Sequence, residues 1–376
     1  MSLIPTPRTP VPALPPAVEI VVVGGGVMGA ATAWQLARRG HEVLLLEQFG
    51  PGHDRGASHG TSRIYRLTYS DPRYVRLAAE ALELWRELEH ETGAGLLTFT
   101  GGVDHGDPDS TGPLAASLAA HGIAYEWLDP QEAAERWPGR VFEGRVLHQP
   151  DRSGRVHADQ AVAAFGAAAV GWGAVVRHRV AVEALEIGGD DRVDVRTTAG
   201  TVRARRVVVT AGAWSAGLTA GLIPLPALRV TQERPVHVVR RPGVPSGPTF
   251  IHHVTDGWPS SVYGLAAPDG RVKLGFHGVG RLRDPDAAPP PADARTARLL
   301  LDYIDRYLPG LDGSTAETVE CTYTSTPDAE FALVAQGPLT VGAGFSGHGF
   351  KFAPAIGRVL ADMATDATAV SPVGPR

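Results

Sequence analysis

The sequence predicts an α/β protein in which a domain containing a βαβ unit is interleaved with a second, α+β domain built on a mostly antiparallel sheet. Three observations predict this fold. A glycine-rich turn lies between two buried strand-like segments near the start of the chain, helical and strand-like segments follow one another through the first half, and residues 225–325 hold mainly strand-like runs. The 376 residues are enough for two domains of about 150 residues or more.

The composition is that of a folded protein with no general affinity for polyanions. Hydrophobic residues make up 43% of the chain and charged residues 20%, so a large core can form. The net charge of −5 argues against a nucleic-acid partner. No apolar run reaches the ~20 residues of a membrane helix, and the single cysteine excludes an intramolecular disulfide. We therefore expect a cytoplasmic enzyme with neither a membrane partner nor a metal site.

The first elements form a recognisable unit. Residues 1–17 are rich in proline and lack a charged segment followed by an apolar one, so we expect a flexible tail and not a signal peptide. The pattern then predicts a strand at residues 18–23, a glycine turn at 24–29, a helix at 30–39 and a second buried strand at 41–47. A βαβ unit of about 30 residues is typical of dinucleotide-binding domains.

The rest of the chain alternates between helices and strands. The pattern predicts helices at residues 74–92, 158–170 and 293–307, a last helix from about residue 354, and strands at 174–185, 191–198, 203–210, 237–240, 250–254, 272–276 and 339–342. Asp293 is suited to cap the third of these helices. Because no clear linker separates the segments, we expect discontinuous domains. The dinucleotide domain would comprise residues 18–98, 152–224 and 326–376, and the substrate domain residues 99–151 and 225–325.

The glycine turn has the spacing of a Rossmann-type nucleotide site. Gly24 permits a tight turn, Gly26 lets the backbone approach a pyrophosphate, and Gly29 allows the helix to pack closely on the strand. The helix N-terminus supplies amide groups and the positive end of a dipole. Glu47 ends the second strand, 18 residues after Gly29, where an acidic side chain can bind ribose hydroxyls. This motif suits FAD and NAD equally.

Other segments combine glycine with charged or reactive side chains. Residues 56–69 (GASHGTSRIYRLTY) form either a solvated polar loop or a loop that lines a cofactor. Residues 340–352 (TVGAGFSGHGFKF) follow a strand and precede a helix, so their amides can face an electron-rich group. Only two of the 35 basic residues are lysines, Lys273 and Lys351. Lys273 and His277 would share one face of a strand. Cys321, by base rate, is a small buried apolar residue.

Taken together, these segments resemble the monomeric sarcosine oxidase and N-methyltryptophan oxidase family of FAD enzymes, from about residue 18 to residue 368. They occur in the family's order: the glycine motif, SHGTSRIYR at 58–66, VVVTAGAW at 207–214, KLGFH at 273–277, CTYT at 321–324 and GFSGHGFK at 344–351. The resemblance implies FAD as cofactor, a small amino acid and O2 as reactants, and a monomeric protein. It also implies that Cys321 is joined to the flavin by a thioether, and that Lys273 is the cation at which oxygen is reduced.

The resemblance further assigns roles to individual residues. The implied catalytic residues are Lys273, Arg63, His59 and His277, and the implied substrate-binding residues are Arg66, Lys351, Tyr323 and Tyr263, with Arg66 and Lys351 holding the substrate carboxylate. The implied cofactor-binding residues are Gly24, Gly26, Val27, Met28, Gly29, Glu47, Gln48, Ser58, His59, Ser62, Arg63, Val180, Ala211, Gly212, Trp214, Cys321, Gly344, Gly347, His348, Gly349 and Lys351.

The expected reaction is oxidation of a secondary or N-methyl amino acid, with hydride transfer to the flavin and reduction of O2 to hydrogen peroxide. One alternative is an amino acid oxidase or dehydrogenase acting on cyclic amino acids, such as pipecolate or proline, or on glycated ones. Alternatives of another class are a non-catalytic dinucleotide-binding module and an NAD-dependent dehydrogenase. The chain departs from the family pattern at Ser58 and at Leu67-Thr68. These departures concern the substrate cavity, so they leave the substrate open.

Overall fold

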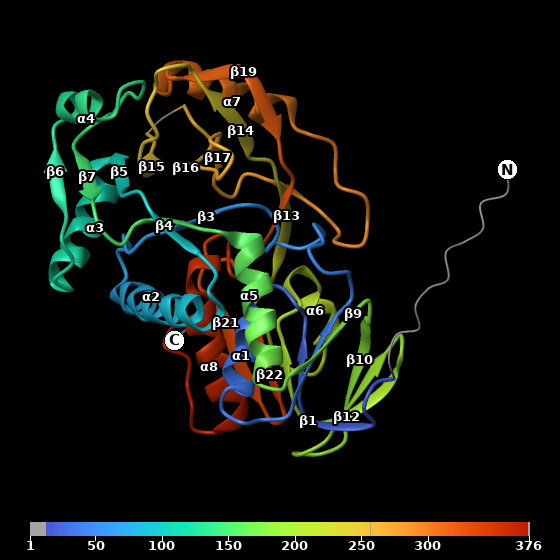
Figure 1. The fold of residues 1–376 in the computed structure, drawn as a ribbon. Helices are drawn as coiled ribbons and strands as arrows, with labels where there is room; N and C mark the ends of the chain where they lie inside the picture. The colour runs from blue at the N-terminus through green and yellow to red at the C-terminus, as the bar shows by residue number, and fades with distance from the viewer. Residues whose placement is uncertain (1–12, 256, 375–376) are drawn as a thin grey trace, which may run out of the picture.

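The computed structural model describes residues 13–255 and 257–374. Most of the expected flexible tail therefore lies outside the described residues, and Ala17 already belongs to the first strand. The described chain contains two eight-stranded sheets and two three-stranded sheets (Figure 1). The expected fold class is confirmed: a Rossmann-like nucleotide-binding fold is combined with a second, mostly antiparallel sheet.

The first sheet has parallel strands at its centre. Strand β1 (Ala17–Val23) pairs in parallel with β2 (Val43–Glu47) and with β12 (Gly200–Val209). The sheet is completed by β9 (Val175–His178), β10 (Val182–Ile187), β11 (Val193–Thr197), β21 (Ala332–Gln336) and β22 (Leu339–Ala343). Since parallel strands align their carboxyl ends, the ends of β1, β2, β12 and β22 meet at one edge, which is where such sheets bind ligands.

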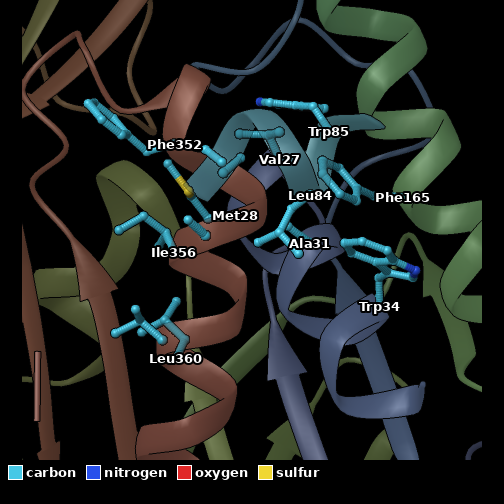
Figure 2. Packing of buried hydrophobic residues seen from close by; sticks show 14 of the residues in the cluster. Val27, Met28, Ala31, Trp34, Leu84, Trp85, Phe165, Phe352, Ile356 and Leu360 are labelled. Atoms are coloured by element: carbon cyan, nitrogen blue, oxygen red, sulfur yellow. The ribbon is translucent and has the colours of Figure 1, made fainter. Parts of the chain in front are cut away.

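Helices pack on the first sheet, and their contacts join an early helix of the chain to its last one. Helix α1 (Val27–Ala37) is buried along its whole length between α5 (Ala158–Gly171) and α8 (Ala353–Thr365). Figure 2 shows Trp34 beside Phe165, with Trp85 of α2 (Pro72–Thr92) above them. At the α1–α8 contact, a Cβ on Gly357 would lie 2.6 Å from the Ala31 carbonyl carbon, and Met28, Ile356 and Leu360 belong to the same buried cluster (Figure 2). This packing fixes the N-terminus of α1 against the chain's last helix.

The second sheet is mostly antiparallel. Its order is β19 (Leu311–Thr318), β14 (Val236–Arg240), β17 (Val272–Phe276), β16 (Val262–Ala266), β15 (Thr249–His253), β5 (Gly102–Gly106), β7 (Val146–Gln149) and β6 (Glu126–Leu128). Helix α7 (Ala294–Tyr307) packs on one face, against Val236, Leu274 and Phe276 among others. Alternate residues of β15, β16 and β17, such as Ile251, Tyr263 and Lys273, line a cavity on the other side.

Short elements connect the large ones. They are β3 (Arg63–Tyr65), β4 (Leu97–Phe99), β8 (Gly154–Val156), β13 (Arg229–Glu233), β18 (Arg281–Leu282), β20 (Cys321–Ser325), α3 (Pro108–Ala120), α4 (Pro130–Arg136), α6 (Ser215–Leu218) and the 3-10 turns at Gly212–Trp214 and Phe350–Phe352. Within the described residues, no helix is both long and apolar enough to cross a membrane.

The main differences from the sequence-based expectation have local causes. The single strand expected at residues 174–185 is wrong: the chain forms β9 and β10, because Arg179 takes a positive φ of 61° and breaks the extended run. Helix α1 begins at Val27, not at residue 30, because Gly26 caps it inside the glycine motif. Two details are confirmed, since β17 has its expected bounds and the Asp293 side chain accepts the Arg295 N–H at the start of α7.

Candidate active site

One cavity of about 820 Å³ is lined by residues from both large sheets. Its walls are the first turn of α1, the end of β2, the loop at residues 56–63, strands β16, β17 and β20, and the glycine turn at residues 344–349. A volume of this size lies within the about 300–1,000 Å³ of small-molecule sites. Every site residue expected from the sequence lines this cavity except Gly29.

The nucleotide end of the cavity is formed by the glycine motif. Gly24 has a φ of 98°, which favours glycine, and a Cβ on Gly29 would lie 1.8 Å from the Gly24 carbonyl oxygen. Gly29 therefore has the packing role that its spacing predicts, away from the ligand. The first turn of α1 holds no acidic residue, and the Val27 N–H donates to the Ser58 hydroxyl at 3.0 Å. Such an open helix N-terminus fits a pyrophosphate.

Glu47 supplies a carboxylate beside this turn. Its two oxygens accept hydrogen bonds from the Gly25 N–H and the Phe49 N–H, each at 2.7 Å. Burial raises the pKa of this carboxyl, but hydrogen bonds from His53, Phe49 and Gly25 outweigh burial and lower the pKa below its usual value. The remaining wall of this end is formed by Gln48, Val180, Ala211, Gly212 and Trp214. An ionised acid at this position fits the ribose of a dinucleotide, so the donors and acceptors of this end fit FAD.

The loop at residues 56–63 folds around the guanidinium of Arg63. This group donates to the backbone carbonyls of Ala57, His59 and Ser62 at 2.7 to 2.9 Å. Its Nη2 also lies 3.9 Å from the Cys321 Sγ. Burial, followed by the charges of Arg63 and Lys273, lowers the pKa of His59 to about 4, so this imidazole is neutral at neutral pH. The loop therefore lines the cavity and is not a solvated surface loop.

Strand β17 places Lys273 on the cavity side, and His277, the residue after its end, lines the same cavity. Lys273 is only 7% exposed, and among the described residues its ammonium makes no hydrogen bond or ion pair. Burial, followed by the nearby Arg63 charge, lowers its pKa to about 7. A buried ammonium without a protein partner is costly unless a ligand faces it. This environment fits a cation that acts on a bound group.

Strand β20 brings Cys321 and Tyr323 to the same cavity. Cys321 is buried, and the Tyr323 ring lies 5.5 Å from the His277 ring. A Cβ on Gly347, whose φ is 74°, would lie 2.1 Å from the Tyr323 ring. The backbone at Gly347 therefore lies so close to the Tyr323 ring that no side chain fits between them. Burial raises the pKa of Tyr263, which also lines this part of the cavity, so its phenol stays protonated.

Arg66 and Lys351 form a pair of cations at the far end of the cavity. The Lys351 Nζ donates to the Tyr69 hydroxyl at 2.8 Å and to the His348 carbonyl at 2.6 Å. Both cations lie over the Tyr69 ring, Arg66 at 5.0 Å and Lys351 at 5.4 Å from its centroid. Burial, and then the charge of Arg66, lowers the pKa of Lys351 well below its usual value. Two cations held this close in a buried site favour an anionic ligand.

Sequence reasoning missed the partner of Arg66. The Asp104 carboxylate, on β5, is 3.1 Å from Arg66 Nη1 and 2.9 Å from His253 Nε2. Burial raises the pKa of Asp104, but Arg66 and His253 outweigh burial and lower it below its usual value. The sequence does contain one relevant signal, because Asp104 is a carboxylate within the strand-like segment VDHG. Its partner His253, on β15, is far away in sequence, so the pairing could not be found.

Comparison with known proteins places the chain in a family. A family model described as FAD dependent oxidoreductase matches residues 19–363. The monomeric sarcosine oxidase of Streptomyces avermitilis is 34% identical over 375 residues, covering 96% of each chain. The N-methyl-L-tryptophan oxidase of Yersinia pestis is 31% identical over 360 residues, covering 93% of this chain and 95% of the relative.

A solved structure agrees with these relatives. The open form of NikD, an unusual amino acid oxidase essential for nikkomycin biosynthesis, superposes with a TM-score of 0.83 at 29% identity, covering 94% of this chain and 95% of NikD. The matches span both sheets and the cavity between them, so they concern the whole fold and not the nucleotide motif alone. With the glycine motif, the acid of β2 and the cavity in one place, the chain belongs to the family of FAD-dependent oxidoreductases.

Proposed function

We propose that the protein is an oxidase of secondary or N-methyl amino acids that carry one carboxylate. The observation that carries the proposal is the charge balance at the far end of the cavity. The Asp104 carboxylate pairs with Arg66, whereas Lys351 has no carboxylate partner among the described residues. The ammonium form of Lys351 therefore matches one substrate carboxylate, whose charge would raise the pKa that burial and Arg66 lower.

The residues on this chain then have separable roles. Arg66 and Lys351 hold the substrate carboxylate, and His277, Tyr323 and Tyr263 surround the rest of the substrate. FAD, when bound, supplies the acceptor for two electrons. The similarity to sarcosine and N-methyl-L-tryptophan oxidases supports an amine that is secondary or N-methylated.

Arg63, His59 and Lys273 form the polar wall around Cys321. The Lys273 ammonium is a fixed positive charge suited to reduction of O2, because negative charge develops as oxygen takes up electrons. Cys321, with its Sγ facing Arg63 across 3.9 Å, is the attachment point we propose for FAD. Its position at the cavity wall supports this assignment.

The proposal extends to the organisation of the chain. The FAD-binding domain would consist of residues 18–98, 152–224 and 326–376, and the substrate domain of residues 99–151 and 225–325. The first of these sets contains the strands and helices of the first sheet, and the second contains the second sheet. We propose a monomer that acts in the cytoplasm without a nucleic-acid partner, on the basis of the net charge and the names of the relatives.

The test is a substrate panel with a peroxide assay on the purified yellow protein. We expect hydrogen peroxide from N-methyl and other secondary monocarboxylic amino acids, and much weaker turnover of matched amines without a carboxylate and of dicarboxylic analogues. Equal turnover of amines that lack the carboxylate would refute the charge argument. Turnover with an artificial electron acceptor but not with O2 would make the protein a dehydrogenase. Preference for cyclic or glycated amino acids would establish the alternative substrate class.

A further inference from the structure

A row of polar side chains crosses the second sheet from the cavity to the surface. In the antiparallel register, Lys273 of β17 lies opposite His237 of β14, and His237 lies opposite Glu317 of β19. Directly opposed residues in neighbouring strands project from the same face of a sheet, with Cβ atoms about 4.5–5.5 Å apart. Lys273 lines the cavity, whereas the Glu317 side chain is 73% exposed. His237 is therefore the residue between the cavity and solvent.

His237 is buried without the partners that a buried histidine normally has. It is 7% exposed, and its Nδ1 has no hydrogen-bond partner within the described part of the chain. A buried nitrogen left without a partner is unfavourable, so such groups are usually satisfied by water or a ligand. The charged groups that face the imidazole are Lys273, Arg271, Asp269 and Glu317. Arg271 pairs with both Asp269 and Glu317, which gathers these three residues into one surface cluster.

The proposed oxidase reaction requires a proton to reach Lys273, where O2 would be reduced. Reduction of one O2 to hydrogen peroxide consumes two electrons and two protons. FAD, when bound and reduced by a hydride, would supply both electrons and one of these protons, so one further proton has to come from solvent. Burial lowers the pKa of Lys273 to about 7, and burial and the Lys273 charge lower that of His237 below its usual value. The lowered pKa of Lys273 lets this group take up and release a proton near neutral pH, and the register places His237 beside it.

We propose that His237 relays this proton from the surface cluster of Asp269, Arg271 and Glu317 to Lys273, through a water molecule bound at its unpartnered Nδ1. The proposal rests on the oxidase activity argued above. His237 does not line the cavity, so it acts through Lys273 and leaves substrate binding to other residues.

The kinetic test compares His237→Gln and His237→Ala with a matched control. His148 is equally buried, at 7% exposed, and lies on β7 of the same sheet, where it pairs with Glu126 away from the cavity. The protein is reduced anaerobically and its reoxidation by O2 is followed by stopped flow. We expect both His237 variants to reoxidise at least about tenfold more slowly than wild type. This loss is smaller than the about 10²–10⁴-fold loss expected for a group that transfers the proton directly, because His237 acts through Lys273. His148→Gln should match wild type, and reduction by substrate should be unchanged in all variants.

Chemical rescue separates a relay from a structural role. Added imidazole should restore the reoxidation rate of His237→Ala with saturation, and should leave His148→Ala unchanged, because only the former lacks a proton carrier. Rates for the His237 variants equal to those of His148→Gln, or slow reoxidation that imidazole does not rescue, would overturn the proposal. If no amino acid reduces the flavin, the protein can be reduced with dithionite and its reoxidation measured in the same way. A failure of the proposed function is then distinguishable from a failure of the relay.

A second readout does not depend on turnover. In ¹⁵N spectra of the histidine side chains, His237 is assigned by the signal lost in His237→Gln, and its pKa is measured by titration. Since the Lys273 charge lowers the pKa of His237, Lys273→Met should raise it. An unchanged His237 pKa in Lys273→Met would show that the two groups are not coupled and would refute the relay.

Discussion

Lys351 is held in a position that only a bound anion makes favourable. It is 5% exposed, its proton is destabilised by burial and by Arg66, and its two hydrogen bonds go to neutral oxygens. Lys351→Met, which keeps the length and removes the charge, should raise KM for a monocarboxylic amino acid by about 10–150-fold. This corresponds to a charge-assisted hydrogen bond of ~1.5–3 kcal/mol.

Steady-state kinetics with a carboxylic substrate and its decarboxylated amine check this prediction. The variant should lose discrimination between the two compounds, because the group that recognises the carboxylate is gone. A variant whose KM for both compounds rises equally would show that the substitution distorts the cavity and that Lys351 does not bind the carboxylate.

Lys273 should act on the oxygen half-reaction and not on the substrate half-reaction. Lys273→Met should slow reoxidation by about 10²–10³-fold, as expected when one preorganised electrostatic group is removed, while anaerobic reduction by substrate changes far less. Because the pKa of Lys273 is about 7, its charge is present below that pH and lost above it. The reoxidation rate of wild type should therefore fall as pH rises through about 7, and that of the variant should not. Stopped-flow measurement of both half-reactions across pH decides the matter.

Cys321 is the residue that tests covalent attachment. Cys321→Ser should leave a folded protein whose flavin is released by acid, whereas wild type should keep its flavin on the precipitated chain. The measurement is absorbance of the supernatant and pellet after acid precipitation. Release of all flavin from wild type would refute the attachment and leave the assignment of FAD intact.

At the scale of elements, the glycine turn after β22 determines the position of Tyr323. A Cβ on Gly347 would lie 2.1 Å from the Tyr323 ring, and the positive φ adds backbone strain. Gly337 offers a matched control, since it also has a positive φ, 55°, but its Cβ would have nothing within 4 Å. Gly337→Ala should cost only the about 1–2 kcal/mol of a left-handed residue. Gly347→Ala should cost more and should also lower turnover.

Thermal unfolding and substrate kinetics on the two variants provide the comparison. Strain alone would lower the unfolding temperature of both by a similar amount. A clash with Tyr323 adds a loss of activity that Gly337→Ala does not share. Equal activity in the two variants would mean that the Tyr323 ring can move aside without consequence.

Elements with a local signal could be predicted from the sequence, and those that depend on distant partners could not. The alternation of Val272 to Phe276 and the cap at Asp293 are local, and both match the structure. The break at Arg179 depends on how its backbone meets Phe49, whose carbonyl accepts the Arg179 N–H at 3.0 Å. The Asp104–Arg66 pair joins β5 to the residue that follows β3, a strand of a different sheet. Neither spacing nor composition contains that information.

At the scale of the whole molecule, the nucleotide site depends on segments from both ends of the chain. Gly357 of α8 packs so closely on α1 that a Cβ there would lie 2.6 Å from the Ala31 carbonyl carbon. Strand β22 likewise completes the parallel set beside β12. The glycine motif is therefore a strong signal for a nucleotide site, but the support that holds the motif in place comes from residues more than 300 positions away.

The contact between α1 and α8 has a consequence for biosynthesis. Helix α8, which packs on α1, leaves the ribosome more than 300 residues after it. At about 5–20 residues per second, roughly 15–60 s pass between the two. During this interval the face of α1 around Ala31, which Gly357 of α8 contacts, lacks its native partner and is open to aggregation or to chaperones. The nascent chain should therefore become able to retain FAD only after α8 has been synthesised and has packed on α1, however early its glycine motif is made.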